Sequence, residues 1–300
     1  MAAVPAVTTD ELIYPPDFGQ RRFLAHLVGN RKFVLGMVVF LIITAVALVG
    51  SLGIEQADRR TGAVRARQEP SAEAILGTTS LGQSVAVQWT EAVLNSLQVG
   101  LIAAAIGTVI GALIGLVSGY FGGMVDAVLR VLIDVFLSVP SLLFLILIAS
   151  LVRGVGVLDM ALIIGIFAWA WPARAVRSQA LSLKERPFVQ VARLSGMGDM
   201  EIVARELLPH MMAWLGANFL NAFIAAILAE SGLSILGLGP QQEMTLGMMI
   251  YWALSYSAIF LNLWWWWLTP VVTLMALFLS LYLVHLGLDE VGNPRLRTQA

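Results

Sequence analysis

The sequence contains no cysteine and little charge. Without cysteine the chain has no disulfide, no thiolate nucleophile and no cysteine ligand for a metal. Only 12% of its 300 residues are charged and 59% are hydrophobic, whereas soluble domains have about 25% and about 45–50%. The charges also balance, at 18 Lys and Arg against 19 Asp and Glu, so the basic field that binds nucleic acid is missing. The composition argues against a soluble domain and against a DNA or RNA partner.

Motifs for catalysis and metal binding are absent as well. No stretch reads GxxxxGK[ST], and the two lysines, Lys32 and Lys184, belong to no phosphate-binding loop. The three histidines, His26, His210 and His285, are far apart, and no HExxH occurs. We therefore expect no catalytic residue, no metal site and no cofactor bound by this chain, and any energy from ATP has to come from a partner.

Six apolar stretches are long enough to cross a bilayer as helices, which need about 20 residues each. They cover residues 33–53, 92–120, 125–152, 155–171, 209–229 and 261–286. The first begins after 32 residues and exceeds a 7–15-residue signal-peptide core, so it is expected to remain as an anchor. The sequence predicts an all-α, polytopic membrane protein with six transmembrane helices.

The distribution of Lys and Arg predicts the orientation, because these residues accumulate on the cytoplasmic side. With the N-terminus inside, 13 of the 18 fall on the cytoplasmic side and five fall outside. Both termini are then cytoplasmic, as tails over residues 1–32 and 287–300. Residues 54–91 form an extracytoplasmic loop, and residues 174–208 form the longest cytoplasmic one.

The cytoplasmic loop 174–208 has helical apolar spacing on both sides of a break. Val189, Ala192 and Leu194 precede Ser195 to Asp199, and further apolar residues follow. Because Gly196 ends a helix and Asp199 can cap the next one, the segment predicts two short amphipathic helices joined by a tight turn. Such a unit suits docking into a groove of a soluble partner; the alternative is a loop that lies on the membrane interface.

A few polar residues within the spans are candidates for a pathway or a gate. Ser138 and Pro140 are two of them, in the third span. Pro140 removes a backbone hydrogen bond and should kink this span, either as a gate or as a static bend. Asn218 and Asn221 share a helix face, and Glu230 lies near the outer end of the same span. These three can line a polar pathway or hydrogen-bond between helices.

Three further patterns concern packing. Gly107, Gly111, Gly115 and Gly119 give the second span one flat face, for internal packing or for a partner. Asp126, Arg130 and Asp134 share a face and can form an ion ladder that holds the third span, or a substrate or proton site. The run Trp264 to Trp267 is typical of an aromatic belt at the membrane interface.

The segment FVQVARLSGMGDMEIVARELLPH, residues 188–210, resembles the EAA signature of ABC importer permeases. In that family the segment is the coupling helix, which seats on the ATPase subunit. Ala192 and Gly196 match the alanine and glycine of the motif, whereas Gln190 stands where the family usually has Glu. The resemblance implies a coupling site made of Arg186, Val189, Gln190, Ala192, Leu194, Gly196 and Asp199.

Other blocks resemble the C-type permeases of dipeptide, oligopeptide and nickel importers. These blocks are residues 119–148, AESGLSILGLG at residues 229–239 and NPRLR at residues 293–297. The outer-loop block LGTTSLGQS is similar to the LGTDxxGRD element of the group, with Thr79, Gln83 and Ser84 in place of its usual Asp, Arg and Asp.

The resemblance implies a permease core over residues 92–286 in the inner membrane, forming half of a translocation pathway for peptides. It implies four kinds of neighbour: a homologous second permease subunit, two ATPase subunits that carry ATP and Mg, an extracytoplasmic solute-binding protein, and membrane lipid. Nickel chelates and oligosaccharides are alternative substrates. An ion-coupled secondary transporter, a membrane-embedded hydrolase and a structural scaffold are alternatives of other classes, although neither an internal repeat nor a nucleophile–base pair is evident.

Overall fold

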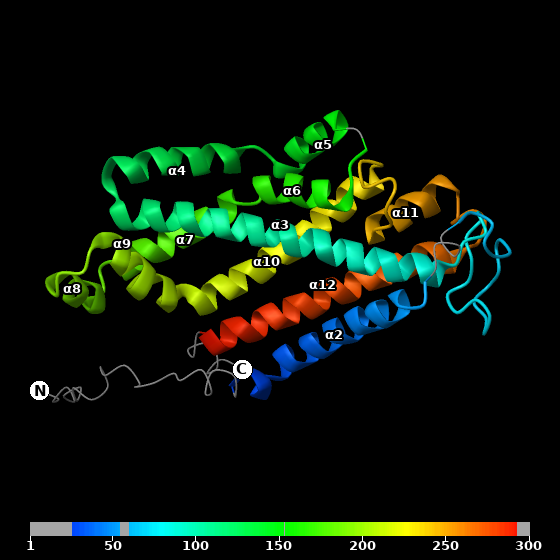
Figure 1. Ribbon diagram of the computed structural model, residues 1–300, viewed down its shortest axis with the longest axis horizontal. Helices are drawn as coiled ribbons and strands as arrows, with labels where there is room; N and C mark the ends of the chain where they lie inside the picture. The colour runs from blue at the N-terminus through cyan, green and yellow to red at the C-terminus, as the bar shows by residue number, and fades with distance from the viewer. Residues whose placement is uncertain (1–25, 55–59, 153, 293–300) are drawn as a thin grey trace, which may run out of the picture.

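The computed structural model describes residues 26–54, 60–152 and 154–292, and the regular structure in them is helical (Figure 1). In this part of the chain an isolated bridge between Thr78 and Ser84 is the one β pairing. The elements in chain order are α2 (Arg31–Ser51), α3 (Val85–Phe121), α4 (Gly123–Ser138), α5 (Ser141–Leu151), α6 (Val157–Phe167), α7 (Ala170–Leu183), α8 (Pro187–Leu194), α9 (Asp199–Ile202), the π-helical turn η2 (Val203–Leu207), α10 (Leu208–Ile235), α11 (Leu246–Ser255) and α12 (Trp264–Gly292). The all-α prediction is confirmed. Of the expected tails, 1–32 and 287–300, residues 1–25 and 293–300 lie outside the described residues. Residues 31–32 and 287–292 are not tails, because they belong to α2 and α12.

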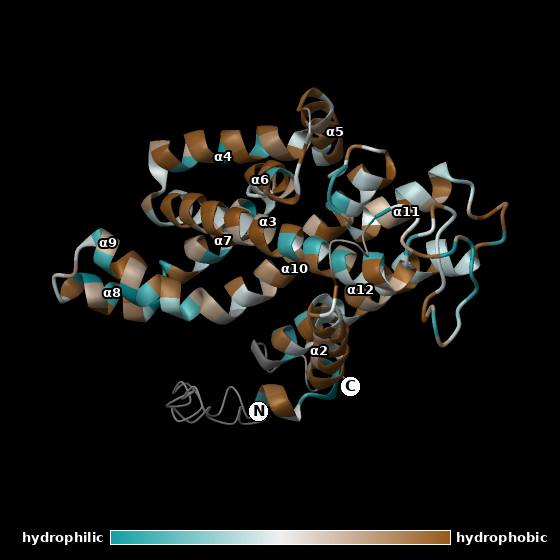
Figure 2. Ribbon diagram, turned by 45° about the vertical axis from the view of Figure 1, so that its right-hand side comes forward, coloured by the Kyte–Doolittle hydropathy of each residue, from teal (hydrophilic) through white to brown (hydrophobic). Residues whose placement is uncertain are grey.

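The long helices agree with the predicted spans. Within the described residues α2, α3, α10 and α12 are each long and apolar enough to cross a membrane. Two bent pairs complete the set, since α4 with α5 and α6 with α7 pass the same test together, which gives up to six spans. The chain is therefore a multi-pass membrane protein, and hydrophobic residues predominate along these helices (Figure 2).

The expected kink at Pro140 is confirmed and is a full break. Helix α4 ends at Ser138, α5 begins at Ser141, and the two axes differ by 77°. Pro140 cannot donate a backbone hydrogen bond and keeps the residue before it out of the helical region. Val139 accordingly adopts an extended backbone, with φ −97° and ψ 131°.

The bundle has two distinct ends (Figure 1). The α8 end carries α8, α9, the beginning of α2 and the end of α12. The loop end carries residues 60–84 and α11. Helices α2 and α12 are joined at the α8 end, where Lys32 forms an ion pair with Glu290 and the Asn30 side chain donates to the same carboxylate over 2.8 Å. Helices α2 and α12 thus pack together along one side of the bundle, where α2 also contacts α3.

The glycine stripe of α3 packs inside the chain against α7 and the residues just before it. A Cβ added at Gly111 would lie 2.7 Å from the carbonyl oxygen of Trp169, and one added at Gly115 would lie 2.6 Å from that of Ala173. These distances are too short for any real Cβ, so the two helix backbones touch only because the stripe is glycine. Of the two readings of the stripe, internal packing is therefore confirmed.

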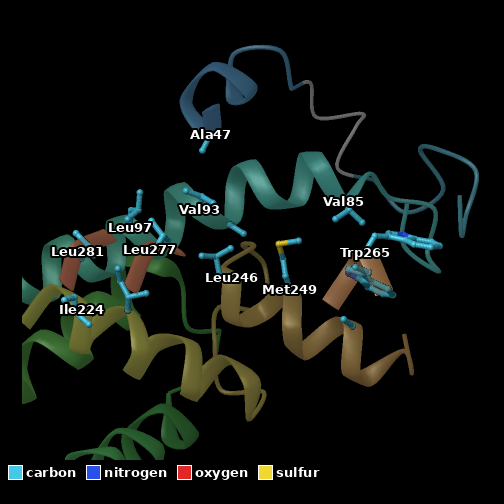
Figure 3. Close-up of a cluster of buried hydrophobic side chains, with 14 of the residues drawn as sticks. Ala47, Val85, Val93, Leu97, Ile224, Leu246, Met249, Trp265, Leu277 and Leu281 are labelled. Carbon is cyan, nitrogen blue, oxygen red and sulfur yellow. The ribbon is translucent and has the colours of Figure 1, made fainter. Parts of the chain in front are cut away.

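A hydrophobic core joins α3, α10, α11 and α12 toward the loop end (Figure 3). Its members include Val93, Leu97, Ile224, Leu246, Met249, Trp265, Leu277 and Leu281. The expectation of an aromatic belt over residues 264–267 is wrong for two members, because Trp265 is 4% exposed and Trp266 is 0% exposed. The chain around Thr78 folds back over the start of α12, and the Trp265 Nε1 donates to the Thr78 carbonyl over 3.1 Å.

Helix α11 was not expected, since its ten residues are too short for a span. It begins at Thr245, whose hydroxyl accepts from the Met248 N–H over 3.2 Å as an N-cap. Its own residues Leu246 and Met249 are fully buried. The helix therefore forms part of the core at the loop end without crossing the membrane.

We predict that Gly111→Ala destabilises the chain by about 2 kcal/mol, because the added methyl overpacks a contact made by backbone atoms that cannot move aside. Thermal unfolding in detergent measures the loss as a lower Tm. The control is Gly216→Ala in α10, where a Cβ meets no atom within 4 Å and the helix gains propensity. Equal Tm values for the two variants would contradict the role of the stripe.

Candidate functional site

The segment at the α8 end consists of two short helices and a turn, as predicted. Pro187 occupies the first turn of α8, and Gly196 adopts φ +85° in the turn that leads to α9. The expected extent of the loop is wrong at its beginning, since residues 174–183 continue α7 rather than forming a loop. Small apolar residues on one face of α7, which contact α3, explain this extension.

The predicted coupling residues divide into a buried and an exposed group. Val189 and Ala192 are 1% and 6% exposed and pack with Ile202 of α9. Arg186, Gln190, Gly196 and Asp199 are exposed, and so are Val191, Leu194 and Met200, at 61%, 88% and 66%. The buried group anchors the segment to the bundle, and the exposed group leaves an apolar surface on α8 and α9 at this end of the molecule.

Asp199 does not cap α9, contrary to the sequence-based prediction. Gly198 is the N-cap residue and Asp199 is already the first helical residue. Its carboxylate instead accepts a 2.7 Å hydrogen bond from the Tyr120 hydroxyl, near the end of α3. Because α3 is 37 residues long, this bond connects the α8–α9 segment directly to the longest element of the chain. The stacked rings of Phe188 and His210, 4.4 Å apart, connect it to α10.

The ion ladder on α4 is present, and its main partners come from α7. Asp126 accepts two hydrogen bonds from Arg177, over 2.5 and 2.7 Å, and a third from Ser118 over 2.6 Å. Arg174 bonds Asp134 over 2.5 Å, whereas the pair predicted along α4, Arg130 with Asp134, is 3.7 Å apart. The ladder therefore holds α4 against α7, which the spacing on α4 alone could not reveal.

A cavity of about 560 Å³ lies where α4 and α5 meet α6, α7 and α10. It brings together two of the five predicted pathway residues, Pro140 and Asn221, with apolar residues around them. Ser138 is adjacent in sequence, but its hydroxyl donates to the Val135 carbonyl over 2.7 Å. Asn218 is 6% exposed and its amide donates to the Trp214 carbonyl, so it does not line the cavity.

Glu230 is fully buried in a polar cluster between α3, α10 and α11. Its carboxylate accepts from Ser234 over 2.6 Å and from Ser96 over 3.2 Å. The Ser96 hydroxyl in turn accepts from the Leu246 N–H, over 3.0 Å. The cluster fixes the beginning of α11, and no intrahelical spacing could have predicted it because Ser96 and Leu246 are 150 residues apart.

The outer-loop block forms a turn held by Thr79. Its Oγ1 accepts from the backbone N–H of Leu81 and of Gln83, each over 3.2 Å, and the residue is 0% exposed. A hydroxyl acceptor thus holds the turn at a position where an aspartate could do the same. Ser84, the next departure from the family element, is the N-cap residue of α3.

The fold defines a multi-pass membrane protein, and its sequence contains no GxxxxGK[ST] loop for ATP. The chain belongs to the family described as the binding-protein-dependent transport system inner membrane component, whose model matches residues 107–298.

Curated relatives cover nearly the whole chain. The oligopeptide transport system permease protein OppC of Mycobacterium tuberculosis is 31% identical over 288 residues, covering 94% of this chain and 97% of its own. The dipeptide transport system permease protein DppC of Bacillus subtilis is 29% identical, covering 97% and 89%. A chain of the methionine ABC transporter MetNI, solved in inward-facing conformations, has a similar fold, with a TM-score of 0.53 and 21% identity over 68% of this chain and 94% of its own.

We predict that Asp126→Asn lowers the free energy of unfolding by about 2 kcal/mol, because Arg177 loses a two-bond carboxylate partner in a mostly buried site. Asp134→Asn is the matched control, since the side chains of its ion pair with Arg174 are 48% and 56% exposed and contribute about 0–1 kcal/mol. Chemical unfolding in detergent compares the two variants. Equal losses would show that α4 does not depend on the Asp126 bonds.

Proposed function

We propose that this chain forms half of the translocation pathway of an ATP-driven importer of short peptides. The names of the relatives support peptides as cargo, since OppC and DppC are described as oligopeptide and dipeptide permeases. The observation that carries the proposal is the exposed apolar surface of α8 and α9. A chain without an ATP site has to bind an ATPase subunit to be driven by ATP, and this surface is suited to such binding.

The geometry of the α8–α9 segment fits a coupling element. Val191, Leu194 and Met200 expose their side chains at the α8 end, while Val189 and Ala192 fix the segment to the bundle. An apolar surface on a short amphipathic helix suits a groove of a soluble subunit. Because the Asp199–Tyr120 bond and the Phe188–His210 stack lead to α3 and α10, a push on α8 reaches two long spans. ATP and Mg belong on the partner ATPase subunits.

The charge distribution supports a cytoplasmic location for the α8 end. Arg174, Arg177, Lys184, Arg186, Arg193 and Arg205 lie on α7 to η2, and Arg31 and Lys32 lie at the start of α2. Lys and Arg mark the cytoplasmic side of membrane proteins. We therefore assign both termini and α8 to the cytoplasm, and residues 60–84 with α11 to the side where a solute-binding protein delivers its cargo.

The cavity at the α4–α5 break is the proposed contribution of this chain to the pathway. Pro140 and Asn221 face it from two different spans, and the break leaves α4 and α5 as separate rods at 77°. Backbone that departs from a helix at membrane depth is tolerated where it lines a cavity. A homologous second permease subunit would complete the opposite wall.

We predict that the double substitution Val191→Glu with Leu194→Glu removes the ATPase subunits from the purified complex, because two charges on the docking surface have to be desolvated. The measurement is co-purification with the tagged chain in detergent, followed by an ATPase assay, and we expect loss of at least about nine-tenths of the bound ATPase. Ile75→Glu is the control, since Ile75 is 74% exposed and belongs to the loop of residues 60–84, which lies at the opposite end of the molecule from α8 (Figure 1).

The possible results of this experiment distinguish the coupling surface from the ATP-driven function. An unchanged Tm for the double variant together with a lost ATPase supports docking through α8. A full complement of ATPase on the double variant would overturn the assignment of the coupling surface, and a wild-type chain that transports peptide only under an ion gradient would overturn the ATP-driven function itself.

We predict that Ala225→Trp blocks peptide uptake while leaving the ATPase bound. Ala225 lines the cavity at the α4–α5 break and is exposed, so the indole fills space without displacing the core. Uptake into proteoliposomes should fall at least about tenfold. Leu228→Trp, on the same helix and outside the cavity lining, is the control. Wild-type uptake by Ala225→Trp would place the pathway elsewhere.

A further inference from the structure

The hydroxyl of Tyr120, in the last turn of α3, holds both short helices of the α8–α9 segment. It donates to the Asp199 carboxylate over 2.7 Å and accepts from the Arg193 guanidinium over 3.4 Å. Arg193 lies in the last turn of α8 and Asp199 is the first residue of α9, so the hydroxyl bonds to both sides of the turn that contains Gly196. Tyr120 is buried, whereas Arg193 and Asp199 are exposed. A buried group of α3 therefore fixes two surface side chains of the proposed coupling segment.

The ring and the hydroxyl of Tyr120 have separable roles. The ring belongs to the hydrophobic cluster that contains Val189, Ala192 and Ile202, so it is part of the packing that anchors the segment. The hydroxyl adds two directed hydrogen bonds, which fix the angle between the segment and α3. Because Tyr120→Phe keeps the ring and removes both bonds, this substitution separates the two roles.

The same turn of α3 is bonded to α4 through Ser118. Ser118 is fully buried and donates to the Asp126 carboxylate over 2.6 Å. Residues two positions apart on a helix point to different sides, which is why Ser118 and Tyr120 have different neighbours. Both contacts lie at the α8 end of the bundle (Figure 1). The last turn of α3 therefore connects the α8–α9 segment to α4.

Helix α4 has a joint at each end and little apolar packing. Gly122 alone separates it from α3, and Gly122 and Gly123 have φ angles of +69° and +56°, which favour glycine. Its other end is the break before Pro140. In α4, all of whose residues the structure describes, Ile133 is the one buried residue among 16. A helix with few buried apolar contacts can be displaced at low cost, and α4 carries Phe136 of the cavity wall.

We propose that Tyr120 is the positioning residue through which the α8–α9 segment moves α4. When an ATPase subunit displaces the segment, the hydroxyl bonds carry the displacement to the last turn of α3, and the Ser118–Asp126 bond carries it to α4. The far end of α4 then changes the width of the cavity at the α4–α5 break. This inference rests on the proposed ATP-driven importer and deepens it, by naming the bonds that connect the coupling surface to the pathway.

The first test measures uptake of radiolabelled trialanine per ATP hydrolysed, by the complete complex with its solute-binding protein in proteoliposomes. Tyr120→Phe should lower this ratio about fivefold while the ATPase subunits stay bound. Ser118→Ala, which removes the bond on the α4 side, should lower it by a similar factor. Tyr282→Phe is the matched control, because Tyr282 of α12 is half-exposed and its hydroxyl has no hydrogen-bond partner among the described residues.

The second test follows the position of α4 directly. Val131 of α4 and Met275 of α12 are both exposed, and the chain has no cysteine of its own, so Val131→Cys with Met275→Cys accepts two spin labels at defined places. Pulsed electron paramagnetic resonance measures the separation of the labels with and without a non-hydrolysable ATP analogue, in a complex whose other subunits lack cysteine. The separation should change on ATP binding, and Tyr120→Phe should abolish the change. A merely structural bond would not produce this difference.

Tm values and bound ATPase are measured on the same preparations, and Ser118→Ala provides a second variant if Tyr120→Phe fails to fold. Wild-type uptake per ATP in the folded variants, or a label separation that does not respond to the analogue in the unsubstituted chain, overturns the role of Tyr120. Loss of the ATPase from Tyr120→Phe also overturns it, because the bonds would then serve docking alone. Failure of the proposed function would appear in the unsubstituted chain, as uptake that needs no ATP, and would overturn both.

Discussion

The contact between α3 and α7 is the constraint on which the arrangement of this chain depends. Lipid offers apolar helices little reason to associate, so a helix pair in a membrane is stabilised by close packing of small residues. Here the stripe Gly107, Gly111, Gly115 and Gly119 brings two backbones together. Because α8 follows α7 after three residues, the same contact fixes where the proposed coupling surface lies. The Asp126–Arg177 pair then places α4 on the outer side of α7, so the position of the α4–α5 break also follows from this contact.

The two ends of the molecule are connected by α10. It has 28 residues, about 42 Å of helix, and reaches from the α8–α9 segment to the Glu230 cluster beneath α11. The segment that leads into α10 is not a regular α-helix, because η2 is a π-helical turn that ends at Leu207, two residues before Pro209. Proline has no N–H for the carbonyl four residues earlier, and its ring needs room beside that carbonyl, so a widened turn accommodates it.

Most of the fold could be predicted from the sequence because lipid imposes strict rules on length and polarity. Apolar length alone was enough to predict the spans over residues 33–53, 92–120 and 261–286. The proline at position 140 was enough to predict the break between α4 and α5. The failures share a cause, which is long-range packing. Helix α11 is too short to be recognised as a span, and Trp265 donates to the carbonyl of Thr78 in a loop distant in sequence. Trp266 stacks with Tyr256, and the Asp199 carboxylate accepts from Tyr120 instead of capping its own helix. Likewise the spacing of Asp126 and Asp134 indicated a shared face but not the arginines of α7 that occupy it.

The polar groups inside the bundle lie where helices have to keep a defined angle. Glu230 is an example, since it is buried between helices and lines neither the cavity at the α4–α5 break nor a second one at the loop end. Its partners Ser96 and Ser234 belong to α3 and α10, and Ser96 also receives the first N–H of α11. Apolar contacts alone would let a short helix such as α11 slide, whereas directed hydrogen bonds in a medium without water fix its position. Since α11 and the segment before it line the loop-end cavity, of about 600 Å³, the buried cluster shapes this cavity without lining it. A polar residue in a span can therefore serve transport by holding a wall in place.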